Sequence, residues 1–256
     1  MRIGFIGTGN ITAAMVNGFC TADPAPTHIL LSPRTAKISA ELAARYDTVS
    51  VAADNQAVVD GSDWVVLAVL PQTCREVIGE LTFRPEQRIV SVIASLTTPE
   101  LEKLIAPATR YVRCVPLPPC ADHVGPIAMC PKDADAEELF GRIGAVVAVD
   151  DAHRFDSLNA ISALMGAFFK FQGVSNDWLI GQGVDNESGK RYISAMCNGI
   201  ARQAFETGED FGDLINEAST PGGMNEQVVR EMVSEGSYDY LPTALDRILD
   251  RLQGRA

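Results

Sequence analysis

A pair of glycines between a strand pattern and a helix pattern constrains this chain more than any other feature. The apolar run RIGFI occupies residues 2–6, Gly7 and Gly9 follow it directly, and a helical pattern extends over 10–22. Glycines in this context permit a tight turn and a close approach of the backbone to a ligand, while free N–H groups at the helix start favour phosphate. We therefore interpret the turn as a dinucleotide-binding turn, in preference to a strand-to-helix connection without a ligand.

Short apolar runs then alternate with helical patterns as far as residue 151. The strand-like runs lie at 28–32, 49–54, 63–69, 88–95, 110–116, 127–131 and 145–151. Strands that alternate with helices predict βαβ units and a mainly parallel, doubly wound sheet, and continuous apolar strands fit burial on both faces. The predicted fold class is thus α/β, with a Rossmann-like first domain over residues 1–151.

The rest of the chain has a helical period. Four segments show it, at 158–172, 189–208, 224–236 and 241–252, and the first of them is strongly apolar. Apolar residues at this spacing predict amphipathic or buried helices. We therefore predict an all-α second domain over residues 152–256.

The end of the second strand indicates which dinucleotide is bound. An NAD enzyme often places Asp or Glu there to bond the ribose hydroxyls, whereas this chain has Ser32, Arg34 and Thr35, with Lys37 one helical turn further on. A guanidinium and a hydroxyl suit the 2′-phosphate of NADP, which a carboxylate would repel. We predict NADP(H) as the cofactor, the alternative being that Arg34 is a solvated loop cation.

Composition excludes several other classes of function. The formal net charge of −12 disfavours nucleic acid and anionic membranes as partners. The six cysteines form no CxxC pair and the three histidines are scattered, so no metal site is expected. The longest apolar stretch, at 64–70, is too short to span a bilayer and no secretory pattern is visible. We expect a cytoplasmic protein.

The same residues resemble a known family, the pyrroline-5-carboxylate reductases. GFIGTGNITAAM at 4–15 resembles the opening of that family, SPRTAK at 32–37 its NADP loop, and DNQAVVDGSDWVVLAVLPQ at 54–72 the segment beyond. RCVPLPPC at 113–120 and STPGGMNEQ at 219–227 resemble two later loops. The similarity runs in register over nearly the whole chain. It implies a Rossmann-like domain followed by a helical domain that forms a homodimer or a larger homo-oligomer.

The resemblance also implies a cofactor-binding set. Its members would meet the pyrophosphate, the 2′-phosphate and the adenosine, or line the cofactor cleft: Gly7, Thr8, Gly9, Asn10, Ile11, Ser32, Arg34, Asn55, Ala68, Val69, Leu70, Pro71, Ala94 and Ser95. Leu70 stands where the family has lysine.

The substrate half departs from the family pattern. The segment DSLNAISALMGAFF at 156–169 carries bulky apolar residues in place of a small polar loop, and Met224 and Asn225 replace two threonines. These changes remove hydroxyl donors where the family binds a proline-like carboxylate. We expect Ser162, Asn159 and Thr220 near the reacting bond, and a substrate-binding set of Gly222, Gly223, Asn225 and Gln227.

The resulting hypothesis is an NADPH-dependent oxidoreductase that reduces the C=N bond of a small imino acid or cyclic imine, of the kind used in proline biosynthesis. Two alternatives stay open. One is an NADP-dependent reductase of a keto or hydroxy acid that uses Lys170, and the other is a non-catalytic NADP(H)-binding sensor. Arg113 is expected to be structural, and His123 is a minor candidate for a proton donor.

Overall fold

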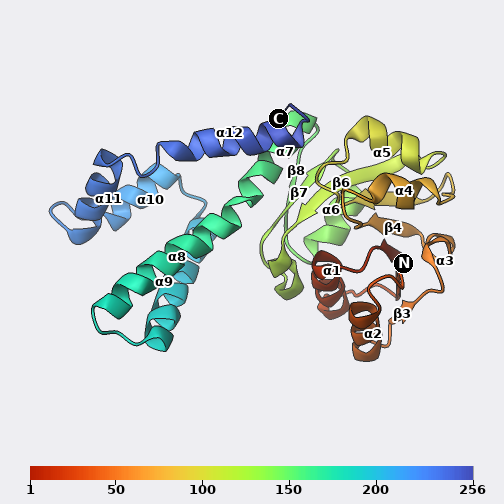
Figure 1. The fold of residues 1–256 in the computed structure, drawn as a ribbon, viewed down its shortest axis with the longest axis horizontal. Coiled ribbons are helices and arrows are strands. Elements are labelled where there is room, and N and C mark those ends of the chain that lie inside the picture. Colours follow the sequence, from red (N-terminus) through yellow and green to blue (C-terminus); the bar gives the residue numbers. More distant parts are fainter. Residues whose placement is uncertain (256) are drawn as a thin grey trace. The chain divides into compact units, whose positions relative to one another are not determined.

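The computed structural model describes residues 1–255, and its central feature is an eight-stranded sheet (Figure 1). The strands run in the spatial order β3-β2-β1-β4-β5-β6-β7-β8. Their bounds are β1 Arg2–Ile6, β2 His28–Leu31, β3 Val49–Val51, β4 Trp64–Leu67, β5 Arg88–Ser91, β6 Arg110–Pro116, β7 Pro126–Cys130 and β8 Ala145–Ala148. All neighbouring strands are parallel except β6 and β7, which are antiparallel. The predicted doubly wound sheet is confirmed.

Helices connect the strands and cover both faces of the sheet. They are α1 Asn10–Thr21, α2 Ala36–Arg45, α3 Asn55–Asp60, α4 Cys74–Gly79, α5 Thr98–Ile105 and α6 Ala134–Gly141, with a 3-10 turn, η1, at Pro118–Asp122. Helices α1, α2 and α6 pack against one face, and α3, α4 and α5 against the other. Helix α6 and the 3-10 turn were not anticipated from the sequence.

Side chains of the central strands point alternately to the two faces of the sheet and form its two hydrophobic cores. Trp64 and Val66 of β4 belong to the cluster beneath α1, whereas Val65 and Leu67 belong to the cluster beneath α3 to α5. Successive strand side chains point to opposite faces, so a continuous apolar strand fills both layers. This is the physical reason why the run at 64–70 predicts a central strand.

The polypeptide divides into two compact units. The first comprises Met1–Ala160 with the residues from Leu249 on, and the second comprises Ile161–Ile248. Helix α7, Ala152–Ser162, and helix α12, Tyr240–Leu252, each contribute residues to both units. The first unit includes most of α7, because the Phe155 side chain of this helix packs against Ala128 and Cys130 of β7.

The second unit is entirely helical in its described residues. It contains α8 Leu164–Gly181, α9 Asn186–Thr207, α10 Phe211–Ala218 and α11 Met224–Ser234. The strongly apolar segment at 158–172 is not one helix, because the chain passes from α7 to α8 at Ala163. Helix α10 was not anticipated from the sequence.

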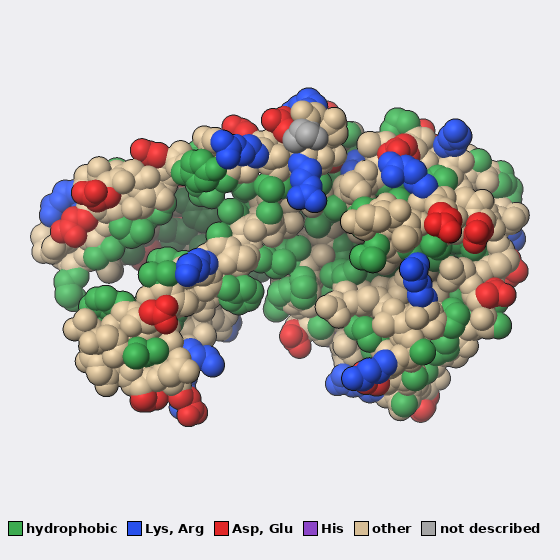
Figure 2. Space-filling view, viewed as in Figure 1, with side chains coloured by type: hydrophobic (Ala, Val, Ile, Leu, Met, Phe, Trp, Pro, Cys, Tyr) green, Lys and Arg blue, Asp and Glu red, His purple; other side chains and the backbone are tan. Residues whose placement is uncertain are grey.

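The second unit has a small core and many exposed apolar side chains. Only Asn176, Gly189 and Ile193 are buried among the described residues of its four internal helices. Phe169, Trp178 and Phe205 are 68%, 64% and 76% exposed. Figure 2 shows hydrophobic side chains gathered over the helical part of the molecule. Exposed apolar surface of this extent marks an interaction face.

Candidate functional site

The glycine turn lies at the point where the strand order reverses. Strand β1 pairs with β2 on one side and β4 on the other, and Gly7 follows its last residue. Gly7 has a φ of +97°, and a Cβ there would lie 2.5 Å from the carbonyl oxygen of Ala68. Glycine is therefore required both for the backbone conformation and for the close approach of the two strand ends. Ligands of open α/β sheets bind at this kind of position.

Two hydroxyl groups hold the turn in place from inside. The Thr12 hydroxyl donates to the carbonyl oxygen of Gly7 at 2.8 Å, and Thr12 is fully buried. The Ser32 hydroxyl accepts from the N–H of Gly7 at 2.9 Å. Both backbone groups of Gly7 are thus satisfied by side chains of neighbouring elements, which fixes the turn before any ligand arrives.

Ser32 and Thr8 link the ends of β1 and β2. The Thr8 hydroxyl donates to the carbonyl oxygen of Ser32 at 2.9 Å and lies 3.2 Å from the Ser32 hydroxyl. Both side chains are buried. The structure therefore places Ser32, expected as a ligand of the 2′-phosphate, with its hydroxyl turned into the protein towards the glycine turn.

The start of α1 is open to a ligand. Gly9 is the N-cap residue and no side chain caps the helix. A Cβ built on Gly9 would meet nothing within 4 Å, and Asn10 is exposed. The first N–H groups of a helix have no partner inside it, and its dipole favours an anion. The residues present fit the pyrophosphate of a dinucleotide.

Arg34 is placed to hold a further phosphate. It is exposed in the loop between β2 and α2, next to the buried Ser32. Among the residues that the structure describes, no carboxylate forms an ion pair with Arg34. A guanidinium without a carboxylate partner at the end of β2 fits the 2′-phosphate of NADP.

The remaining cofactor candidates lie at the same edge of the sheet. Asn55 begins α3 after β3, Ala68 to Pro71 follow β4, and Ala94 and Ser95 follow β5. Because these strands are parallel, their carboxyl ends meet at one edge. Ala68, Leu70, Ala94 and Ser95 are accessible there, Leu70 being 67% exposed, while Val69 is buried.

The expected catalytic residues lie on two elements. Asn159 and Ser162 are one turn apart on α7, and Asn159 is buried. Thr220 is exposed in the turn between α10 and α11. Asn159 belongs to the first unit, and Ser162 and Thr220 to the second.

The Pro-Gly-Gly turn before α11 is internally hydrogen-bonded. The N–H of Gly222 donates to Oε2 of Glu226 at 2.7 Å, and the N–H of Gly223 donates to the carbonyl oxygen of Thr220 at 2.8 Å. Gly222 has a φ of +75°, a conformation that glycine adopts without strain. The glycines alone do not predict the contact from Glu226. The signal that could have predicted it is a carboxylate four residues beyond Gly222.

Two other residues singled out from the sequence have structural surroundings. Nε2 of His123 lies 2.9 Å from the carbonyl oxygen of Gly18, in the third turn of α1, rather than at the glycine turn. Arg113 is buried and pairs with Asp156 of α7 at 3.3 Å, with its guanidinium 4.5 Å from the Phe155 ring. The expected structural role of Arg113 is confirmed, through this ion pair rather than through loop carbonyls.

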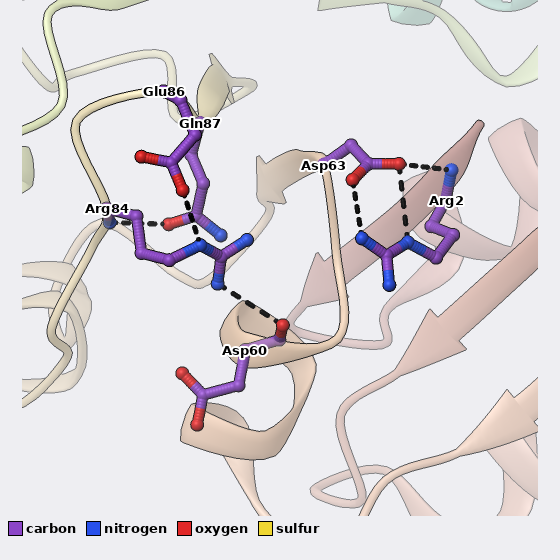
Figure 3. A pocket seen from close by; sticks show the side chains of 6 residues that line it. All are labelled: Arg2, Asp60, Asp63, Arg84, Glu86 and Gln87. Carbon is purple, nitrogen blue, oxygen red and sulfur yellow. Dashed lines mark hydrogen bonds and ion pairs between the residues drawn. The ribbon is translucent and has the colours of Figure 1, made fainter.

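A separate cavity of about 430 Å³ lies at the opposite, amino-terminal ends of the strands (Figure 3). Four of its five charged side chains form two ion pairs: Arg2 binds Asp63 at 2.7 Å, and Arg84 binds Glu86 at 2.9 Å. The Arg2 guanidinium lowers the pKa of Asp63 below its usual value, chiefly through their hydrogen bond. The remaining charged side chain, Asp60, accepts from Nε2 of Gln56 at 2.8 Å.

Metal and membrane signals are missing from the residues that the structure describes. Over residues 1–255, no three His, Cys, Asp or Glu side chains come together in a way that could hold a metal ion. No helix in the same range combines the length and the apolar character needed to cross a bilayer.

The fold and the glycine turn together define a class: two-part oxidoreductases whose first half binds a dinucleotide. Residues 2–95 match the family model described as "NADP oxidoreductase coenzyme F420-dependent".

The longer matches are to pyrroline-5-carboxylate reductases. The chain is 26% identical to the pyrroline-5-carboxylate reductase of Pseudomonas aeruginosa, over 98% of this chain and 95% of the relative. It is 27% identical to that of Methanosarcina acetivorans, over 98% and 96%. The structure of a pyrroline-5-carboxylate reductase from Coxiella burnetii superposes with a TM-score of 0.85 at 24% identity, covering 99% of this chain and 98% of that one. The resemblance to the pyrroline-5-carboxylate reductase family is confirmed along nearly the whole chain.

A further solved structure supports the fold. The pyrroline carboxylate reductase of Plasmodium falciparum, solved with NADP bound, superposes with a TM-score of 0.84 at 17% identity and covers 100% of this chain and 98% of that one. The predicted fold class, a Rossmann-like domain followed by a helical region, is thereby confirmed.

Proposed function

We propose that this protein reduces the C=N bond of a small imine with NADPH. The observation that carries the proposal is the glycine turn, preset by Thr12 and Ser32 at the reversal point of the sheet, in a chain that matches reductases from end to end. When bound, the nicotinamide supplies a hydride to the imine carbon while the nitrogen gains a proton, so that the imine becomes an amine and NADPH becomes NADP⁺.

The chain's own residues bind and orient the reactants. The open start of α1, from Gly9 to Ile11, would bind the pyrophosphate, and Arg34 the 2′-phosphate. Ala68, Leu70, Pro71, Ala94 and Ser95 would line the cleft at the same edge of the sheet. Thr8 and Ser32 support the turn from within.

For the substrate, we infer catalytic roles for Asn159, Ser162 and Thr220, and substrate binding by Gly222, Gly223, Asn225 and Gln227. A cyclic imine is readily protonated near neutral pH, so a hydroxyl or an amide can hold the nitrogen's proton and no strong acid is needed. We place the functional division of the chain at residues 1–151 and 152–256, with cofactor chemistry in the first part.

The finer preference for NADP over NAD rests on Arg34. An ionised guanidinium binds phosphate through charge-assisted hydrogen bonds, and the end of β2 carries no Asp or Glu of the kind that binds the ribose hydroxyls of NAD. We also infer a cytoplasmic location, on the similarity to the pyrroline-5-carboxylate reductases.

A homodimer is the assembly we propose. Its support is the exposed apolar surface of the second unit, where the side chains of Phe169, Trp178 and Phe205 face solvent in the isolated chain. Burying apolar area removes it from water and drives association. Sedimentation equilibrium of the full chain tests the assembly, and a monomer at micromolar concentration would contradict it.

The function itself is tested by NADPH absorbance at 340 nm with a panel of cyclic imines and matched keto acids. We expect oxidation of NADPH with at least one imine, and none with the keto acids. Turnover of a keto acid that Lys170→Ala abolishes would favour the hydroxy-acid alternative. Tight NADPH binding without turnover of any compound would favour the sensor.

A further inference from the structure

The segments that follow β4 and β5 carry no charged side chain. After the last residue of β4 the chain reads AVLPQTC at 68–74, and after that of β5 it reads VIASLTTP at 92–99. Charged residues make up 21% of the whole chain, and β4 and β5 are neighbours in the sheet. The absence of charge from both segments is therefore a local feature of this part of the carboxyl edge.

The charges that directly follow the two segments neutralise each other. Arg75 comes after the first and Glu100 after the second, and they form an ion pair at 2.5 Å. Glu100 also accepts from the hydroxyl of Thr97 at 2.8 Å. Glu76, in the first turn of α4, is exposed and has no ion pair within residues 1–255. The role of this carboxylate is therefore tested separately below.

The uncharged surface begins at the glycine turn. A Cβ built on Gly7 would lie 3.0 Å from the backbone nitrogen of Val69, so the end of β4 lies directly against the turn. Leu70 follows, and its side chain is 67% exposed. After the paired strand β5, Ala94 and Ser95 are also exposed. The surface beside the turn thus presents one large apolar side chain and two small uncharged ones.

The proposed cofactor site assigns this surface to the nicotinamide half. Arg34, the proposed ligand of the 2′-phosphate, follows β2 on one side of β1, whereas Leu70 follows β4 on the other side. A dinucleotide binds across the reversal point of such a sheet, with its pyrophosphate at the glycine turn. When the adenosine phosphate is at β2, the other half of the molecule extends towards β4 and β5.

We propose that the uncharged segments after β4 and β5, with Leu70 as the determining side chain, make this protein bind NADPH more tightly than NADP⁺. The inference rests on the proposed function, because it takes the position of the cofactor from it. The two forms share the adenosine, the 2′-phosphate and the pyrophosphate, but loss of the hydride leaves the nicotinamide ring positively charged. Moving a charge from water to an uncharged surface costs free energy unless an opposite charge pairs with it.

The charge of the whole protein has little influence on this preference. The formal net charge of −12 would favour the more positive NADP⁺. Exposed charges further than about 8 Å apart are largely screened at physiological ionic strength, so the groups beside the ring decide. A preference for the reduced form favours release of the oxidised cofactor after hydride transfer.

Calorimetric titration of the full chain with each cofactor form tests the proposal without relying on turnover. At physiological ionic strength, we expect the dissociation constant of NADP⁺ to be at least about tenfold higher than that of NADPH, since an unpaired charge is costly to desolvate. Equal affinities, or tighter binding of NADP⁺, would overturn the inference and leave imine reduction intact. The expected ratio in a protein that reduces no imine would instead overturn the proposed function and leave this preference standing.

Leu70→Asp places a carboxylate on the uncharged surface. The ratio of the two dissociation constants should fall about tenfold, because opposite unit charges a few ångströms apart near a protein surface attract strongly enough for this. Leu70→Asn is the matched control, since it changes the shape in nearly the same way without the charge, and it should keep most of the ratio. A ratio that Leu70→Asp leaves unchanged, or that both variants lower equally, would overturn the role of Leu70.

Two further variants separate this surface from charge elsewhere. Val51→Asp adds the same charge at the exposed end of β3, on the adenosine side, and should leave the ratio unchanged. A fall equal to that of Leu70→Asp would mean that net charge alone acts, which would overturn the inference. Glu76→Gln should also leave the ratio unchanged. A rise in this variant would show that a carboxylate already compensates the ring, and would overturn the claim that the surface is uncharged.

Discussion

Replacing Ser32 with alanine tests the internal support of the glycine turn. The substitution removes the acceptor of the Gly7 N–H while leaving every atom of the loop that faces solvent in place. An unsatisfied buried donor costs about 1–3 kcal/mol. For a protein of this size each kcal/mol lowers the melting temperature by about 2–4 °C, so we expect a fall of about 2–12 °C.

The same substitution has a distinct signature in cofactor binding. Because Ser32 supports the pyrophosphate turn and not the 2′-phosphate site, Ser32→Ala should lower the affinities for NADPH and NADH by a similar factor. This factor is about tenfold if restoring the turn costs about 1.4 kcal/mol. Titration by nucleotide fluorescence measures both affinities. Ser39→Ala is the control, since Ser39 is a buried serine whose hydroxyl bonds carbonyl groups at the start of its own helix. A selective loss of NADPH affinity, with NADH unchanged, would refute the reasoning.

Two further predictions concern the first unit. Arg113→Leu leaves Asp156 buried without its partner, so the free energy of unfolding measured in urea should fall by about 3–5 kcal/mol. The double variant Arg113→Leu/Asp156→Leu should recover part of this loss. Equal losses in the single and double variants would contradict the pairing. Burial raises the pKa of the Cys120 thiol to about 11, so its thiolate fraction at pH 8 is about a hundredfold lower than that of a free cysteine. Alkylation followed by mass spectrometry should label Cys120 slowly in the native protein and fully after denaturation, whereas rapid native labelling would contradict its burial.

The sequence predicts the sheet well because its strands are buried on both faces. Each central strand is a continuous apolar run bounded by turn residues, and this pattern has few other solutions in a soluble chain. Helices α6 and α10 were not predicted because each has only eight residues, although the apolar residues of α10 recur at helical spacing. The break at Ala163 lies within one apolar segment, where residue type alone gives no sign of an interruption.

The site is predictable in its backbone and less so in its side chains. Gly7 follows from local pattern, because only glycine tolerates its conformation and its contact with Ala68. The direction of the Ser32 hydroxyl depends on the distance between two strand ends that are 25 residues apart in the chain. The contact from Glu226 to Gly222 likewise depends on the shape of a turn. Hydrogen-bond partners of this kind are set by tertiary structure.

The central claim is that the ends of β1 and β2 bind the pyrophosphate and the 2′-phosphate of one dinucleotide. The most direct measurement is the ratio of the dissociation constants of NADH and NADPH for the unaltered protein and for Arg34→Ala. We predict a ratio of at least about ten for the unaltered protein, because a charge-assisted hydrogen bond contributes about 1.5–3 kcal/mol, and a ratio close to one for the variant. Equal affinities in the unaltered protein, or a ratio that Arg34→Ala leaves unchanged, would contradict the account.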